Sequence, residues 1–418
     1  MVFEKITRQS GRNMMSTLDD GAEKNNGMLS VSINSQGQDN YDFKRRAALV
    51  RQTKEELELE ELEPLPSPWT LEIEPTLLCN AHCHFCSYKE DIAKFKRSKL
   101  GNKFGLSKSV VLKTLEAIKD AATTKGTYWS GGGEPLIWPH FKQAVQLAAT
   151  FSDVFIQTNG ICLNQHLYDP ESLLVFKLIS ISVFANNAEM HFEISKTKSF
   201  ERIVKNINDT LAMKRKYGLE IVLNVKIMID TINYRILPAI VKFYEDLGVD
   251  SIGLRLVQNY NYGGVGPRKI SVELSQEQKA ELFKIIELSN YQHPSLKAFA
   301  KTLTGQATKV AVTPHCYNAI DGHFACIDAW GNVYIGNPEI GNDEFCIGNI
   351  NENPWEKIWK SKTHYRVVRQ MDEMEQKGVC ASQLCRHVKA NIGAQEYVFG
   401  IIGQQDQEAV MKAFGAFL

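Results

Sequence analysis

The chain has 418 residues, and its 48 lysines and arginines balance 48 aspartates and glutamates, so the formal net charge is zero. This length predicts two domains, while 44% apolar and 23% charged residues are typical of a soluble globular protein. The balanced charge indicates no nucleic acid or membrane partner, and no apolar run is long enough to span a bilayer.

Residues 1–66 are predicted to form a polar N-terminal leader and one helix. The first forty or so contain no apolar segment of the kind that a signal peptide carries. The stretch FKRRAALVRQTKEELELEELE follows, and it predicts an exposed helix that ends at PLPSP. Nine cysteines in such a chain indicate metal ligands or reactive thiols in a reducing, cytoplasmic location.

Strands and helices alternate from Trp69 onward. Strands are predicted at 69–76, 126–132, 153–160, 178–185, 220–229 and 251–258. Helices with apolar residues at helical spacing are predicted at 107–122, 140–150, 199–218, 234–248 and 275–289. This pattern predicts an α/β fold with a parallel sheet, whose functional loops follow the carboxyl ends of the strands.

Three cysteines lie in the loop after the first of these strands. The stretch CNAHCHFC places Cys79, Cys83 and Cys86 with gaps of three and two residues. Three thiolates at this spacing fit a compact metal centre that keeps one position open. The alternative is structural zinc, with His82 or His84 as the fourth ligand.

The C-x3-C-x2-C spacing, with the aromatic Phe85 before the last cysteine, resembles the radical S-adenosylmethionine superfamily. The resemblance implies a partial (βα)6 TIM-like barrel over residues 67–295 and a [4Fe–4S] cluster on Cys79, Cys83 and Cys86. In that family the open iron binds S-adenosylmethionine, whose reductive cleavage gives a 5′-deoxyadenosyl radical that abstracts a substrate hydrogen. It also implies an electron donor of the flavodoxin or ferredoxin type.

The GGGEP stretch that ends the second strand resembles the family loop that holds the methionine amino group. Glycines there let the backbone approach a ligand closely. The cofactor-binding residues implied by the resemblance are Phe85, Gly131, Gly132, Gly133, Glu134, Asn159, Ser182 and Arg255. For three of them another interpretation stays open: Asn159 as a turn residue, Ser182 as a satisfied buried serine, and Arg255 as part of a barrel-edge ion pair.

Residues 296–418 resemble the SPASM or twitch extension of that family, a small domain with cysteines. The shared features are a leading cysteine, ID-x2-GNVY, IGNI and W-x2-IW, although no cysteine follows GNVY. Five thiols are too few for two fully ligated clusters, so the resemblance implies one auxiliary [4Fe–4S] cluster. Its expected ligands are Cys316, Cys346, Cys380 and Cys385, with Cys326 as an alternative. The other interpretation is a degenerate extension whose cysteines are free and buried.

The resemblance implies an oxidoreductase- or epimerase-type enzyme, with either a small molecule or a peptide as its substrate. The polar start of the chain does not resemble the peptide-recognition domain of many peptide maturases, which favours a small molecule such as a sugar or an aminoglycoside-like alcohol. A radical peptide maturase that modifies a ribosomal peptide is the alternative. A non-enzymatic metal-binding or electron-transfer protein is a further alternative, but it would explain neither GGGEP nor the six strands.

Overall fold

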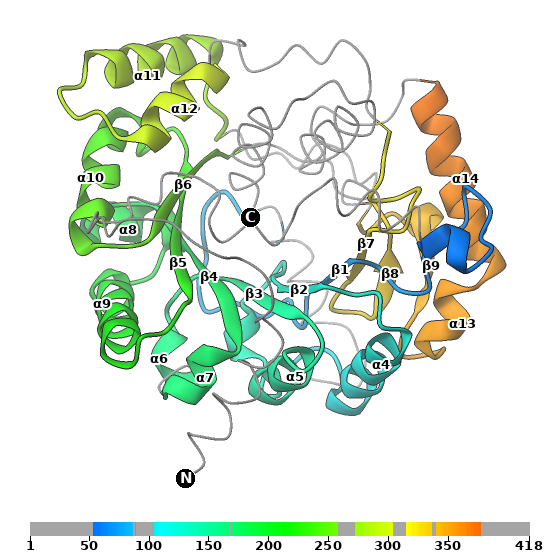
Figure 1. Cartoon of the computed structure of the whole chain (residues 1–418). Coiled ribbons are helices and arrows are strands. Elements are labelled where there is room, and N and C mark those ends of the chain that lie inside the picture. Colours follow the sequence, from blue (N-terminus) through cyan, green and yellow to red (C-terminus); the bar gives the residue numbers. More distant parts are fainter. Residues whose placement is uncertain are drawn as a thin grey trace, which may run out of the picture. The chain divides into compact units, whose positions relative to one another are not determined.

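A nine-stranded sheet organises the computed structural model, in the order β6-β5-β4-β3-β2-β1-β7-β8-β9 (Figure 1). The structure describes residues 53–86, 88, 104–166, 169–257, 272–303, 315–336 and 340–377. All of them belong to one unit of the chain, Val31–Leu418.

Six strands that follow one another along the chain pair in parallel, as the sequence predicts. They are β1 (Thr70–Ile73), β2 (Gly126–Trp129), β3 (Asp153–Thr158), β4 (Phe176–Val183), β5 (Val222–Ile229) and β6 (Ser251–Leu256). β7 (Phe324–Ile327) adds in parallel to the free side of β1, and β8 (Asn332–Tyr334) and β9 (Cys346–Asn349) continue antiparallel. β6 and β9 are therefore the two ends of the sheet, which is an open, partial (βα)6 barrel with three added strands.

Helices cover the outer face of this sheet and its two ends (Figure 1). The α-helices are α4 (Lys108–Ala121), α5 (Phe141–Ala148), α6 (Leu163–His166), α7 (Pro170–Leu174), α8 (Ala188–Ser195), α9 (Phe200–Tyr217), α10 (Leu237–Leu247), α11 (Gln276–Leu288), α12 (Pro294–Leu303), α13 (Trp355–Trp359) and α14 (Lys362–Gln376). The 3-10 turns are η1 (Pro135–Ile137), η2 (Tyr234–Ile236) and η4 (Asp343–Phe345). α9 ends at Gly218 in the left-handed conformation, as predicted, because glycine enters that region without steric cost. None of the described helices is long and apolar enough to cross a membrane.

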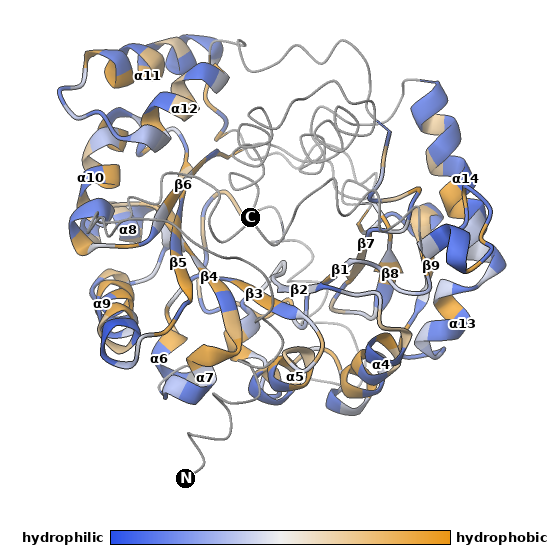
Figure 2. Ribbon diagram, in the orientation of Figure 1, coloured by the Kyte–Doolittle hydropathy of each residue, from blue (hydrophilic) through white to orange (hydrophobic). Residues whose placement is uncertain are grey.

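The strands alternate between an apolar outer face and a polar inner face, because successive side chains point to opposite sides of a strand. The outer face joins the helices in one core that includes Leu71, Trp129, Ile156, Ile181 and Val225. Figure 2 shows hydrophobic residues concentrated on the strands and hydrophilic ones on the outward sides of helices such as α4 and α14. The inner face carries Glu72, Tyr128, Gln157, Ser182, Lys226 and Arg255. A buried parallel sheet is normally apolar on both faces, so the polar inner face marks a functional interior.

The predicted N-terminal helix ends earlier than its charge pattern indicates. In the described part only residues 53–56 are helical, and a turn follows at residues 57–58. Lys54 is buried instead of lying on a solvated face, and its Nζ lies 3.0 Å from Asp321 Oδ1. The chain turns here because it packs onto the C-terminal part: Leu65 is fully buried, and its carbonyl accepts the indole N–H of Trp359.

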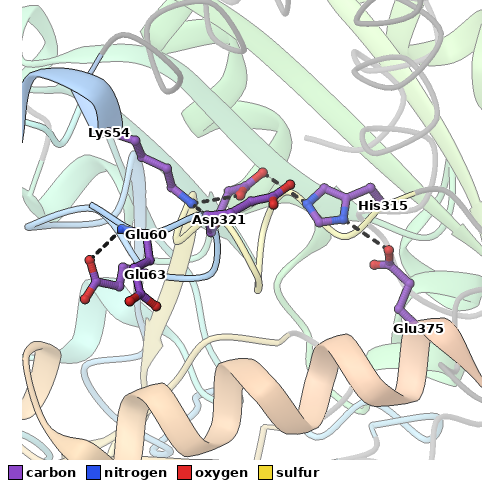
Figure 3. A network of polar contacts seen from close by, with 7 residues as sticks. Lys54, Glu60, Glu63, His315, Asp321 and Glu375 are labelled. Atoms are coloured by element: carbon purple, nitrogen blue, oxygen red, sulfur yellow. Dashed lines mark hydrogen bonds and ion pairs between the residues drawn. The ribbon is translucent and has the colours of Figure 1, made fainter. Parts of the chain in front are cut away.

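A chain of ionic contacts extends from Lys54 to α14 (Figure 3). The Asp321 carboxylate lies between Lys54 and His315, and the other ring nitrogen of His315 lies 3.1 Å from Glu375 Oε1. Burial disfavours the charged imidazolium, but the two carboxylates outweigh burial and raise the pKa of His315 to about 10. The network therefore joins the N-terminal segment, the segment before β7 and the end of α14.

The domain boundaries at 66/67 and 295/296 stay predictions. At the first, the Ser67 carbonyl accepts a hydrogen bond from Thr123, so the chain already contacts the barrel there. The second falls inside α12, where the Ser295 hydroxyl donates to the Ile252 carbonyl of β6 at 2.8 Å. The helix with the predicted boundary thus packs on the barrel.

Candidate functional site

The three cysteines of the triad lie in the loop that leaves the carboxyl end of β1. Cys79, Cys83 and Cys86 are partly exposed and form no disulfide within the described residues. The loop is held against the end of α8, because the His82 and His84 amides donate to the carbonyls of Ser195 and Ile194 at 3.0 and 2.9 Å. The triad is therefore at the sheet edge where barrel enzymes carry their active sites.

Two side chains between the cysteines brace the loop against the barrel. His84 Nε2 lies 2.7 Å from Oδ2 of Asp230, a buried residue just after β5. The Phe85 ring meets the edge of Phe184, with centroids 5.4 Å apart. His84 thus has a contact that positions the loop, and Phe85 packs on the residue that follows β4.

The donor set at the triad fits an iron–sulfur cluster. Burial, together with the nearby charges of Glu134 and Cys86, raises the pKa of Cys79 to about 11, so positive charge is needed to hold it as a thiolate. The Cys79 sulfur accepts hydrogen bonds from the Ala81 amide at 3.4 Å and the Asn159 side chain at 3.7 Å, contacts that stabilise a ligating sulfur. Among the described residues, no three His, Cys, Asp or Glu side chains are grouped as metal ligands.

The GGGEP loop lies directly on the cysteine loop, and Glu134 joins the two. Glu134 is 1% exposed, and its amide donates to the Leu78 carbonyl at 2.8 Å. Its carboxylate accepts hydrogen bonds from Thr158 Oγ1 and the Asn159 amide at 2.7 Å each, and from the Leu136 amide at 3.1 Å. Burial raises the pKa of Glu134 to about 6, against the effect of these donors. Glu134 is thus a buried connection between the ends of β2 and β3.

The glycines of this loop are needed for contacts within the protein. A Cβ on Gly133 would lie 2.4 Å from the Leu78 carbonyl oxygen and 2.5 Å from that of Thr76. A Cβ on Gly132 would lie 2.3 Å from the Tyr88 ring and 2.4 Å from the Leu77 side chain. The sequence predicts glycine here for close approach of a ligand, and the structure adds close approach of the cysteine loop.

Asn159, after β3, is more than a turn residue. Its Nδ2 donates to Asn80 Oδ1 at 2.7 Å, and the Asn80 amide donates to the Cys162 sulfur at 3.2 Å. Cys162 is buried. Thr158, Asn159 and Gly160 form the turn that we call the TNG turn. These contacts connect it to Asn80, the residue that follows the first cysteine of the triad.

Ser182 and Arg255 lie on the inner face, at β4 and β6, away from the cysteine loop in the sheet order. Ser182 Oγ accepts a hydrogen bond from Gln157 Nε2 at 2.7 Å, and the Tyr128 hydroxyl donates to Gln157 at 3.3 Å. The sequence interpretation missed Tyr128, Gln157 and Lys226. The available signal was the alternation along each strand, which places all three on the side opposite the helices.

The structure brings together only some of the expected auxiliary ligands. Cys326 on β7 and Cys346 on β9 pair in register with Tyr334 from its two sides, and all three belong to one small buried cluster. The Cys316 amide donates to Glu375 at 2.6 Å, and this cysteine packs on the main core instead. Cys380 and Cys385 lie outside the described residues.

Comparisons with known proteins agree with this architecture. A family model described as the radical SAM superfamily matches residues 73–218. The AdoMet-dependent heme synthase of Methanosarcina barkeri is 24% identical over 304 residues, which are 66% of this chain and 79% of that protein.

Two solved structures of Streptococcus suis SuiB share the fold. The one bound to the precursor peptide SuiA has a TM-score of 0.53 and 13% identity, over 88% of this chain and 77% of that one. The one bound to S-adenosylmethionine has a TM-score of 0.51 and 14% identity, over 76% and 71%. The residues that the radical SAM superfamily model matches, 73–218, include the cysteine triad at the end of β1, and the fold of the chain is similar to that of the two SuiB structures.

Proposed function

We propose that this protein is a radical SAM enzyme whose catalytic [4Fe–4S] cluster is held by Cys79, Cys83 and Cys86. When bound, the cluster and S-adenosylmethionine supply the 5′-deoxyadenosyl radical that removes a hydrogen atom from the substrate. The observation that supports this best is the contact of three loops at one sheet edge. Glu134 joins the cysteine loop, GGGEP and the TNG turn through the Leu78 carbonyl and the Asn159 amide.

The chain's own residues would hold and orient the cofactor. Glu134 would keep the backbone of Gly131, Gly132 and Gly133 against the cysteine loop, while Asn159 would donate to the Cys79 sulfur. The other proposed cofactor contacts are Phe85, Ser182 and Arg255. A donor of the flavodoxin or ferredoxin type would supply the electron, in a reducing cytoplasm where the described cysteines stay free thiols.

We also propose one auxiliary [4Fe–4S] cluster in the C-terminal part, with Cys316, Cys346, Cys380 and Cys385 as ligands and Cys326 as the alternative. Two of the four proposed ligands, Cys316 and Cys346, lie within the described residues, and they support the proposal in part. Cys346 is partly exposed, whereas Cys326 is fully buried beside Phe324 and Tyr334, which favours Cys346 as the ligand.

One variant, with Cys79, Cys83 and Cys86 all changed to Ala, tests both clusters. Reconstituted anaerobically with a chemical reductant, the wild-type protein should form 5′-deoxyadenosine and hold about eight irons. The variant should form none and keep about half of the iron, because the auxiliary cluster has its own thiolates. Formation of 5′-deoxyadenosine by the variant would refute the role of the triad, and iron near zero in a folded variant would refute the auxiliary cluster.

The substrate that we propose is a small molecule, such as a sugar-like alcohol, which the enzyme oxidises or epimerises. The inner face supports this choice, because the hydroxyl group of Tyr128 and the amide group of Gln157 lie on it. A peptide is the second candidate, since the structurally similar SuiB was solved with its precursor peptide SuiA.

A filtrate of a cell extract can distinguish the two candidate substrate classes, a small molecule and a peptide. We expect the filtrate to stimulate 5′-deoxyadenosine formation, and protease treatment of the filtrate to leave that stimulation intact. Loss of the stimulation after protease treatment would contradict the small molecule and support the peptide.

A further inference from the structure

The inner face of the barrel carries a continuous row of polar side chains that ends in two cations. Tyr128, Gln157 and Ser182 are linked by hydrogen bonds across β2, β3 and β4. Ser182 is the register partner of Lys226 on β5, and Arg255 follows on β6, two residues beyond Gly253, the register partner of Lys226. The row therefore runs across five neighbouring strands on the side away from the helices.

Lys226 and Arg255 lie close enough to repel each other. Burial, together with the positive charge of Arg255, lowers the pKa of Lys226 to about 7. Arg255 also acts on Tyr128, whose pKa it lowers against the stronger effect of burial. The charge of Arg255 thus acts on residues of both β5 and β2.

Lys226 is the residue of this row that we expect to contact a ligand. Within the described residues it forms no hydrogen bond or ion pair, whereas Arg255 has interactions of its own. Two like charges in a poorly hydrated interior destabilise the fold unless an anion offsets them. A lysine that lies beside a second cation without a hydrogen bond or ion pair is typical of a binding site, where a residue needed for function lowers the stability of the fold.

Space beside Lys226 is provided by the strand next to it. Its register partner on β6 is Gly253, which has no side chain. A Cβ added there would meet nothing nearer than 3.9 Å, with the Asn224 side chain and the Val225 carbonyl as its nearest contacts. Lys226 itself is only partly exposed.

We propose that Lys226 forms a subsite for an anionic group, a carboxylate or a phosphate, of the substrate, next to Arg255, which keeps its proposed contact with the cofactor. The inference rests on the proposed function, because it takes the barrel interior to be the substrate site. It narrows the substrate class: an aminoglycoside with several positive charges is disfavoured, while an acidic sugar or another molecule with a carboxylate or phosphate fits. The methionine carboxylate of S-adenosylmethionine has the same chemistry, so the test must separate the two sources.

The test uses the reconstituted full chain, with citrate and inorganic phosphate as probes in calorimetry at constant ionic strength. We expect one citrate or phosphate per chain, with affinity reduced at least about tenfold in Lys226→Met and largely kept in Lys226→Arg. Lys177→Met is the matched control, since Lys177 is exposed at the other end of β4. Without anions, Lys226→Met should melt at the same temperature as the wild type or higher, because it removes a buried like-charge contact.

Saturating S-adenosylmethionine should leave the binding of the probes unchanged if the subsite belongs to the substrate. Displacement by S-adenosylmethionine but not by its decarboxylated analogue would assign the subsite to the cofactor and overturn the proposal. Equal affinity of wild type and Lys226→Met would also overturn it, as would a Lys226→Met variant that fails to fold. The radical SAM function is judged separately in the same preparations: absence of 5′-deoxyadenosine would refute that function and leave the anion subsite standing.

Discussion

His364 is buried in its neutral form between Trp359 and Tyr365. Its Nδ1 donates to the Trp359 carbonyl at 2.6 Å, and its Nε2 is buried with no hydrogen-bond partner among the described residues. Burial lowers the pKa of His364 from 6.5 to about 4, despite the opposing effect of that carbonyl. Protonation on Nε2 would place an unpaired charge inside the C-terminal part.

We therefore expect acid to destabilise the protein through this residue. Because the folded pKa is below the usual value, the stabilisation is complete above pH 6.5 and is lost as the pH falls toward 4. At about pH 5 the loss is about 2 kcal/mol. Urea unfolding at about pH 7.5 and about pH 5 should show this difference in the wild type. His364→Asn keeps a donor for the Trp359 carbonyl and should lose that share of the pH dependence; an unchanged pH dependence would contradict the assignment.

At the scale of an element, the GGGEP loop offers a matched pair of substitutions. A methyl group on Gly133 meets backbone oxygens of Thr76 and Leu78, whereas one on Gly132 meets the ends of the Leu77 and Tyr88 side chains. Side-chain ends can rotate away, but backbone cannot move without shifting the cysteine loop. We expect Gly133→Ala to cost about 2 kcal/mol and Gly132→Ala about 1 kcal/mol or less.

Chemical denaturation measures both costs, and calorimetry on the reconstituted protein measures the affinity for S-adenosylmethionine. Gly133→Ala should weaken cofactor binding more than Gly132→Ala, since the cysteine loop moves with it. Equal stability of the two variants would show that the loop accommodates a methyl group at both positions, and that the tight contact with Leu78 is not what holds the cysteines in place.

At the scale of the whole described unit, Asp321 connects parts of the chain that are far apart in sequence. It contacts Lys54 and His315, and His315 contacts Glu375 on α14 (Figure 3). The charges of His315 and Lys54 outweigh burial and lower the pKa of Asp321 to about 2. Its removal leaves two cations mostly buried without this counter-charge.

We expect Asp321→Asn to lower the free energy of unfolding by about 3 kcal/mol. The matched control is Asp246→Asn, which breaks the exposed Lys242–Asp246 pair and should cost less than about 1 kcal/mol. Urea denaturation gives both values. Limited proteolysis should also cut the Asp321→Asn variant earlier near residue 54, because Lys54 loses its anchor. Equal stability of the two variants would mean that the network does not hold the N-terminal segment.

Local sequence determined much of this protein. The six parallel strands, the end of α9 at Gly218 and the cysteine triad after β1 were all predicted, because each depends on residues a few positions apart. Hydrophobic periodicity, a glycine stop and a fixed spacing of thiols are properties of short segments. The same holds for the GGGEP loop, which the sequence already placed at the end of β2.

Tertiary structure alone decided which of these segments meet. The pairing of Thr70 with Phe324 makes β7 a neighbour of β1, and no short pattern encodes a contact between such distant positions. The charged residues around Lys54 predicted an exposed helix, yet Lys54 is buried and contacts Asp321. The sequence interpretation missed Lys226, whose pKa depends on burial and on the charge of Arg255 on the neighbouring strand. Hydrophobic periodicity predicts the face of the strand on which a residue lies. Its burial and its charged neighbours depend on which residues the folded sheet places near it.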